Sequence, residues 1–77
     1  MSYEGMKAVR EILWRSDQVL HLATDQPSIA DIIVRYLETK ALLGGLMCAV
    51  AATITSSSAL VRLEVLRVSL QALLVRD

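Results

Sequence analysis

Few residues of this chain have the types and spacing that catalysis or metal binding requires. The clearest group is Asp17, His21 and Asp25, which follow one another at intervals of four residues. On a helix they would form a ladder of two carboxylates around an imidazole, which favours the protonated imidazole. Three ligands in a line on one helix are a poor match to the tetrahedral arrangement of zinc. We therefore expect a solvated charge ladder and no metal site.

Cys48 is the single cysteine, and it lies in a stretch of apolar and small residues. Because apolar surroundings disfavour the thiolate, we expect Cys48 to pack as a small hydrophobic residue rather than to act as a nucleophile. Gly44 and Gly45 lack the following lysine and serine, or the spaced glycines, of a phosphate-binding loop. The sequence therefore predicts no enzymatic activity, no cofactor and no small-molecule substrate.

Trp14 is a candidate for binding a partner. It falls in the polar sector of the first predicted helix, one turn from Arg10. Tryptophan and arginine are enriched among the residues that dominate binding energies, so the two would form a compact anchor. The alternative is that Trp14 packs under another part of the same chain or lies along Arg10.

The elements that position these residues are predicted to be helices, because apolar residues recur at helical spacing. The expected helices cover about residues 3–24, 29–43, 46–55 and 59–76. Pro27 disfavours helical geometry before it, Ser28 would cap the second helix, and Gly44-Gly45 would end it.

The second predicted helix is amphipathic. Its polar side carries Asp31, Arg35 and Glu38. The apolar face consists of Ile29, Ile32, Ile33, Tyr36 and Leu43.

The last segment is apolar on two opposite sides when drawn as a helix. Its leucine face consists of Leu60, Leu63, Leu66, Leu70, Leu73 and Leu74. The opposite side, which we call the valine stripe, consists of Val61, Val65, Val68, Ala72 and Val75. Two polar seams separate the faces, with Arg62, Ser69 and Arg76 on one flank and Glu64, Arg67 and Gln71 on the other. Such a helix needs apolar contacts on both sides, so we expect it to lie between its own chain and another.

A competing interpretation of this segment is a strand. Apolar and polar residues alternate over residues 61–65 and again over 66–70, with one slip between them. Residues 50–55 and 60–65 would then form a hairpin, giving an α+β fold. The helix is favoured because the strand would need a bulge and because leucine, arginine, glutamate and alanine are good helix formers.

Composition points to a partner. A chain of 77 residues of which 55% are apolar has more apolar surface than a small domain covers, since such a domain buries only about 60–65% of its unfolded surface. One cysteine rules out an internal disulfide, so association is the remaining source of stability. Eight basic and eight acidic residues leave no net charge for binding a nucleic acid.

The location of the protein is predicted from the same features. One free cysteine and a charged N-terminal segment without a signal-peptide pattern indicate the cytoplasm. The alternative is a small membrane protein, because 21 consecutive residues, 41–61, carry no charge and that length spans a bilayer. Small residues recur at every fourth position there, but the Thr and Ser residues near 53–58 dilute its hydrophobicity.

The sequence thus predicts an all-α protein, a single domain of three or four helices in an antiparallel bundle, completed by self-association through the valine stripe or the leucine face of the last helix. Its function would be non-enzymatic protein–protein binding, as an assembly subunit, an adaptor or a chaperone-like protein. The expected partner is a second copy or another helical protein. The expected contact residues are the valine stripe together with Trp14 and Arg10. A charge introduced at Val65 or Val68 should convert the oligomer to a destabilised monomer.

Overall fold

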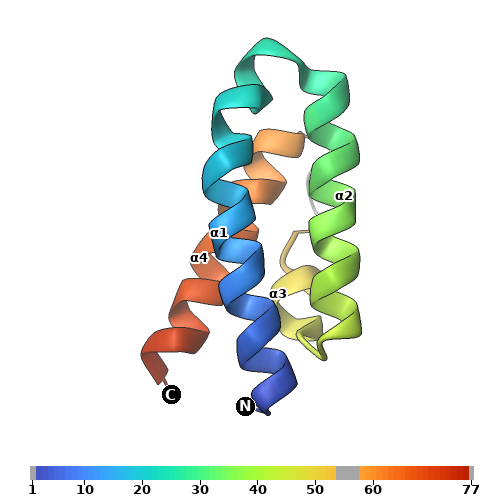
Figure 1. Cartoon of the computed structure of the whole chain (residues 1–77). Helices are drawn as coiled ribbons and strands as arrows, with labels where there is room; N and C mark the ends of the chain where they lie inside the picture. Colours follow the sequence, from blue (N-terminus) through green and yellow to red (C-terminus); the bar gives the residue numbers. More distant parts are fainter. Residues whose placement is uncertain (1, 54–57, 77) are drawn as a thin grey trace.

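The computed structural model describes residues 2–53 and 58–76, with the side chains of 21–24 and 76 not described. The described residues form four helices: α1 (Tyr3–Asp25), α2 (Pro27–Leu43), α3 (Met47–Ala51) and α4 (Ala59–Arg76). Helix α1 runs antiparallel to both α2 and α4, so that α1 begins and α4 ends at the same end of the bundle (Figure 1). The short α3 lies at that end and packs against α2 and α4. The predicted all-α bundle is confirmed.

Local interactions explain most of the helix ends. The hydroxyl oxygen of Ser2 accepts a hydrogen bond from the Gly5 amide at 3.0 Å, and that of Ser58 accepts one from the Val61 amide at 3.4 Å, as expected of N-terminal caps. At the end of α2, Gly45 has a φ of 80°, and the Leu46 amide donates to the Ala41 carbonyl at 2.8 Å. This is the left-handed glycine termination that the Gly44-Gly45 pair predicts.

The start of α2 differs from the prediction. The helix begins at Pro27, and Gln26 is its cap residue without a side-chain hydrogen bond. The predicted Ser28 cap is wrong, because proline already has the φ of a first helical residue and has no amide hydrogen to satisfy. The third helix is also shorter than predicted, ending at Ala51. Residues 54–57 of the predicted 46–55 helix and of the link after it lie outside the described residues.

The long helices and α3 share one hydrophobic core. Its buried members are Val9, Ile12, Val19, Val34, Leu37, Ala41, Leu46, Ala49, Val50, Leu63, Leu66 and Leu70. Ala30 and Ala41 of α2 are fully buried in the interior of the bundle. Where α2 ends, Gly44 lies against α1, and a Cβ added to Gly44 would be 2.8 Å from the Cβ of Ala8.

This close approach selects a face of α2 that its pattern of large apolar residues does not indicate. The buried residues are Ala30, Val34, Leu37 and Ala41. Of the predicted apolar face, Ile33 packs partly against the core, whereas Ile32 is 67% and Leu43 is 85% exposed. The buried face therefore combines two alanines with Val34 and Leu37, and most of the other large apolar residues of α2 lie outside it.

The uncharged run of residues 41–61 does not form one helix. It contains the end of α2, all of α3 and the start of α4, besides the residues that are not described. Leu46, Ala49 and Val50 are buried in the core, which accounts for part of the apolar character of the run. Across the described residues, the helices are either too short or too polar to cross a bilayer.

The strand interpretation of residues 61–70 is wrong, because this segment is the central part of α4. A helix lets Leu63, Leu66 and Leu70 enter one core, whereas the alternation has a slip that would turn half of the strand outward. The α+β alternative is therefore excluded for the described part of the chain.

Candidate interaction surfaces

Helix α4 buries one of its two apolar faces and exposes the other. On the leucine face, Leu63, Leu66 and Leu70 are fully buried. On the valine stripe, Val61 is 45%, Val68 is 65% and Val75 is 86% exposed. Ala72 is exposed and Val65 is half-buried. Among the residues that the structure describes, then, nothing packs fully over the valine stripe.

The predicted anchor on α1 is exposed but is built differently. Trp14 is 59% exposed, and Arg10 is exposed as well. The guanidinium over the indole belongs to Arg15, 5.9 Å from the ring centroid, at a distance typical of a cation–π contact. Trp14 and Arg10 lie on α1 and the valine stripe lies on α4, so these predicted contact residues occupy different helices.

A second exposed apolar surface lies on α2. We call it the α2 stripe, and it consists of Ile29, Ile32, Tyr36, Thr39 and Leu43. Exposure is 45% at Ile29 and 49% at Tyr36, and higher at Ile32 and Leu43. The hydroxyl group of the exposed Thr39 donates to the Arg35 carbonyl at 2.9 Å, which satisfies its polar atom within the helix. Sequence reasoning identified most of these residues as a face but did not show that the face is exposed.

The polar residues beside these surfaces tie the helices together. Arg62, read from the sequence as part of a polar seam, has a side chain that is only 8% exposed. It donates to Glu38 at 2.7 Å and to Asp31 at 2.9 Å, both on α2. The Thr53 hydroxyl lies 2.5 Å from Glu38 and 2.7 Å from the Val50 carbonyl. The spacing of Asp31 and Glu38, two helical turns apart, was the available signal for this cluster.

The charged partners shift the titration of both carboxyl groups. Hydrogen bonds from Arg35 and then Arg62 hold the pKa of Asp31 below its usual value. Burial alone would raise the pKa of Glu38, but hydrogen bonds from Arg62 and Thr53 outweigh it, and the pKa is lowered. The hydrogen bond to Glu38 in turn raises the pKa of Arg62. All three groups are therefore charged near neutral pH, and the cluster is a paired structural element.

The other flank of α4 is tied to α1. Arg67 donates to the hydroxyl of the buried Ser16 at 2.7 Å and pairs with Asp17 at 2.5 Å. The Ser16 hydroxyl donates in turn to the Leu13 carbonyl at 2.8 Å. Asp17 is therefore held by α4, which the predicted ladder with His21 and Asp25 did not include. The side chain of His21 lies outside the described residues.

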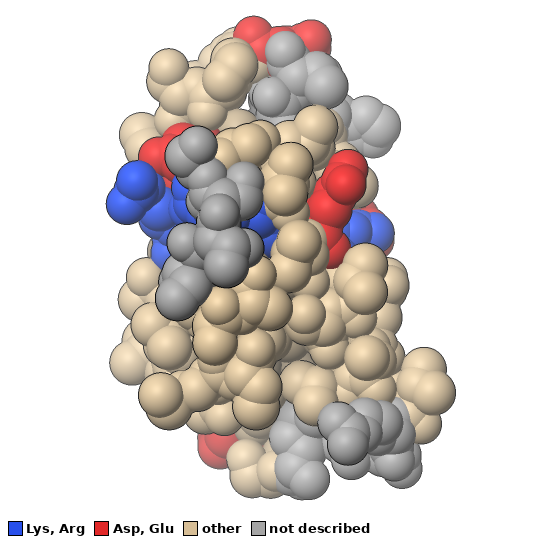
Figure 2. Space-filling model, turned by 180° about the vertical axis from the view of Figure 1, so that it is seen from behind, with Lys and Arg blue, Asp and Glu red and all other residues tan. Residues whose placement is uncertain are grey.

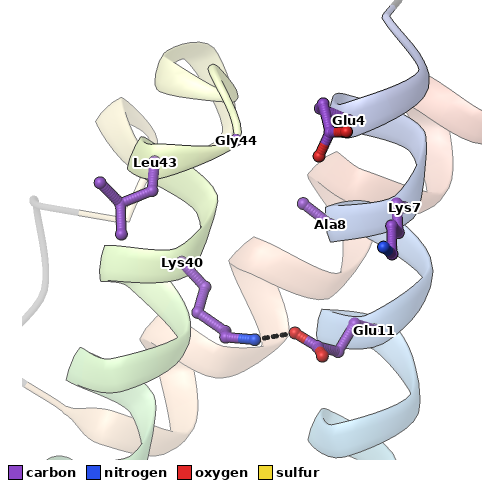
Figure 3. Close-up of a pocket in the computed structure, with 7 residues that line it drawn as sticks. All are labelled: Glu4, Lys7, Ala8, Glu11, Lys40, Leu43 and Gly44. Atoms are coloured by element: carbon purple, nitrogen blue, oxygen red, sulfur yellow. Dashed lines mark hydrogen bonds and ion pairs between the residues drawn. The ribbon is translucent and has the colours of Figure 1, made fainter.

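A shallow pocket of about 320 Å³ opens between α1 and the end of α2. Figure 3 shows Lys40 of α2 and Glu11 of α1 pointing toward one another, joined by an ion pair. Glu4 and Lys7 supply a second charge of each sign, and Ala8, Leu43 and Gly44 supply the apolar lining. The acidic and basic side chains that line the pocket are equal in number, and the ion pair connects α1 to α2 across it.

Cys48 does not occupy the packed position that was predicted for it. It is exposed, because α3 is a short helix that turns Ala49 and Val50 toward the core. Over the residues that the structure describes, no three histidine, cysteine or acidic side chains gather to hold a metal ion.

The charges of the molecule are distributed unevenly. On the face seen in Figure 2, charged side chains gather in a band across the middle, and the area below it is largely uncharged. That area belongs to the end of the bundle that carries α3 and the C-terminal half of α4 (Figure 1). No family model, curated protein or solved structure matches the chain.

Proposed function

We propose that this chain is a non-enzymatic assembly subunit that binds further copies of itself through the valine stripe. The observation that carries the proposal is the division of α4 into two faces. Leu63, Leu66 and Leu70 already fill the core, whereas Val68 and Val75 are left mostly exposed. Regularly spaced β-branched residues on an exposed helix are typical of helix–helix contacts between chains.

Burial of the valine stripe alone provides too little free energy for a stable assembly. Covering five half-exposed small residues yields roughly 1 kcal/mol each. The total, about 5 kcal/mol, lies at the lower end of the about 4–15 kcal/mol that association costs in lost freedom of motion. A stable assembly therefore needs further apolar residues opposite the stripe, as well as polar residues at its edges.

The proposed partner is a protein in the cytoplasm. The basic and acidic residues balance at eight each, which favours a protein over a nucleic acid. A single exposed thiol at Cys48 is compatible with a reducing compartment.

The test is the substitution Val68→Asp. Because Val68 is 65% exposed, aspartate fits the single folded chain, but it places an unpaired charge in the proposed contact. We expect the wild type to be oligomeric and Val68→Asp to be monomeric, as measured by native mass and sedimentation, with unchanged helical content by circular dichroism. Gln18→Asp, at an exposed position of α1, is the control and should remain oligomeric. A wild type that is monomeric at high concentration would contradict the proposal.

A further inference from the structure

The α2 stripe has the spacing that complements the valine stripe. Its residues follow one another at intervals of three, four, three and four, whereas those of the valine stripe follow at four, three, four and three. Both are the alternation of a helix–helix seam. Each stripe covers 15 residues, which is about 21 Å between its first and last Cα along a helix.

When one stripe is read in the opposite direction, the two sets of intervals become identical. If α2 of one copy lies antiparallel to α4 of another, each residue of one stripe therefore meets one of the other. Leu43 lies opposite Val61 and Ile29 lies opposite Val75, with the remaining three pairs between them.

The sizes of the side chains also match in this arrangement. Ile32 faces Ala72, and Tyr36 faces Val68, so a large side chain meets a small one in both layers. Interdigitation of large and small residues is the usual way in which helices fill the space between them. Thr39 meets Val65, and its hydroxyl is already bonded to its own helix. It therefore brings no unpaired polar group into the contact.

Pairing of the valine stripe with itself is less complete when the helices are antiparallel, and when they are parallel it sets each small residue against its own copy. In an antiparallel pair with the same kind of layers, Val65 meets Val68 and Val61 meets Ala72, which leaves Val75 without a partner. All the side chains in the contact are then small, so few of them can fit between side chains of the other helix. The α2 stripe would also stay exposed, with Ile32 at 67% and Leu43 at 85%. One contact between unlike stripes covers both surfaces.

We infer that the valine stripe of one copy binds the α2 stripe of a second copy, with the two helices antiparallel. This inference rests on the proposed function and names the surface that receives the stripe. The molecule measures 35 by 23 by 20 Å along its principal axes, so a second copy is long enough to cover the about 21 Å over which each stripe runs. A second copy is therefore a partner of sufficient size.

The contact is head-to-tail. On α2, Asp31 points toward α4, where it pairs with Arg62. Tyr36 lies on another side of α2, where the Lys40 ammonium is 5.6 Å from the centroid of the Tyr36 ring. Lys40 in turn pairs with Glu11 of α1. The α2 stripe is thus directed away from α4, and one partner does not cover both stripes. Each copy offers one stripe of each kind, so the assembly grows into a ring or a chain of copies.

Mixing two disabled variants tests this inference. Val68→Asp disables the valine stripe and Ile32→Asp disables the α2 stripe, each at a position exposed in the single chain. We expect each variant alone to be monomeric and their equimolar mixture to form a species of twice the 8.5 kDa chain mass, because each retains the stripe that the other lacks. If Val68→Asp or Ile32→Asp loses helical content, the experiment is repeated with Val75→Asp and Leu43→Asp. These substitutions are at the most exposed positions of the two stripes.

The outcomes separate the two proposals. If Ile32→Asp still associates while Val68→Asp is monomeric, the valine stripe binds itself, and the inference is overturned although the proposed function stands. If both are monomeric and the mixture stays monomeric, the inference is also overturned. If the wild type itself is monomeric, the proposed function fails first. The control variant Gln18→Asp, which retains both stripes, should associate like the wild type.

Cross-linking tests the direction of the helices. In a Cys48→Ser background, chains carrying Ile29→Cys are mixed with chains carrying either Val75→Cys or Val61→Cys and then mildly oxidised. The antiparallel pairing predicts a disulfide with the Val75→Cys chains and little with the Val61→Cys chains, because only adjacent Cβ atoms can be bridged. The reverse preference would show parallel helices and overturn the pairing inferred here.

Discussion

Arg62 shows how one residue's environment can differ from its local pattern. In the sequence it stands between the two apolar faces of a helix, where a long charged side chain would ordinarily reach solvent. In the fold it is nearly buried and binds two carboxylates of α2. Removing a partner from such a pair leaves a charge without compensation, which costs more than the pair contributes in total.

At the scale of the residue, we therefore predict that Arg62→Met lowers the free energy of unfolding by about 2 kcal/mol, because Glu38 keeps its burial but loses its strongest donor. Arg35→Met is the matched control. The Arg35 side chain is 70% exposed and also pairs with Asp31, so its loss should cost under about 1 kcal/mol. Urea denaturation measures both. Equal losses would mean that burial does not strengthen the Arg62 pairs.

At the scale of the element, the contact between α1 and α2 depends on small residues. Gly44 has a φ of −83°, which any residue adopts, so its glycine is required by space rather than by backbone conformation. A Cβ added at Gly44 would lie 2.8 Å from the Cβ of Ala8, which is attached to the α1 backbone and cannot swing away. The end of α2 is thereby held against α1.

We predict that Gly44→Ala lowers the free energy of unfolding by about 1–3 kcal/mol, because the helices must separate to admit the new methyl group. Ala8→Gly removes the opposing methyl group at a cost of its own of about 1 kcal/mol in helix propensity. In that background Gly44→Ala should cost much less than it does alone. A double-mutant cycle in thermal or urea unfolding measures the difference, and strictly additive effects would refute the steric explanation.

At the scale of the whole molecule, the free energy of unfolding of the bundle depends on ion pairs as well as on a small core. The ion pairs Arg62 with Glu38, Arg67 with Asp17 and Lys40 with Glu11 each connect two different helices. Because a chain of 77 residues builds only a limited core, the loss of these pairs bears on the stability of the whole fold.

The pH dependence follows from the lowered pKa values of Asp31 and Glu38. The unfolded chain takes up protons near the ordinary values of 3.8 and 4.5, whereas the folded chain does so at lower pH. Their stabilisation is therefore fully present above those ordinary values and is lost as the pH falls through the folded values. We predict a free energy of unfolding that decreases from about pH 5 toward about pH 2.

The control for this prediction is Arg62→Met. Without the guanidinium, the two pKa values move back toward their ordinary range, so the variant should be less stable at neutral pH and show a shallower decrease in acid. Circular dichroism during urea titrations at several pH values measures both curves. Parallel curves for wild type and variant would contradict the assignment of the pH dependence to this cluster.

The sequence by itself determined the helical class, most helix bounds and the two-sided character of α4. These depend on local properties: helical periodicity, the serine and glycine residues at the ends, and the capacity of Leu, Arg and Glu to form helices. The same reasoning identified the leucine face and the valine stripe as alternatives, because a wheel of one helix shows that two faces are apolar without showing which one meets the core.

Only the tertiary structure decided which surfaces are covered. It buried Ala30 and Ala41 instead of Ile32 and Leu43, exposed Cys48, and turned Arg62 inward. Each of these outcomes depends on how near a second helix lies, and that distance is set by contacts between residues far apart in the chain, such as Gly44 with Ala8. Periodicity within one helix carries no information about that distance, which is why the exposed stripes became visible only when the helices were packed together.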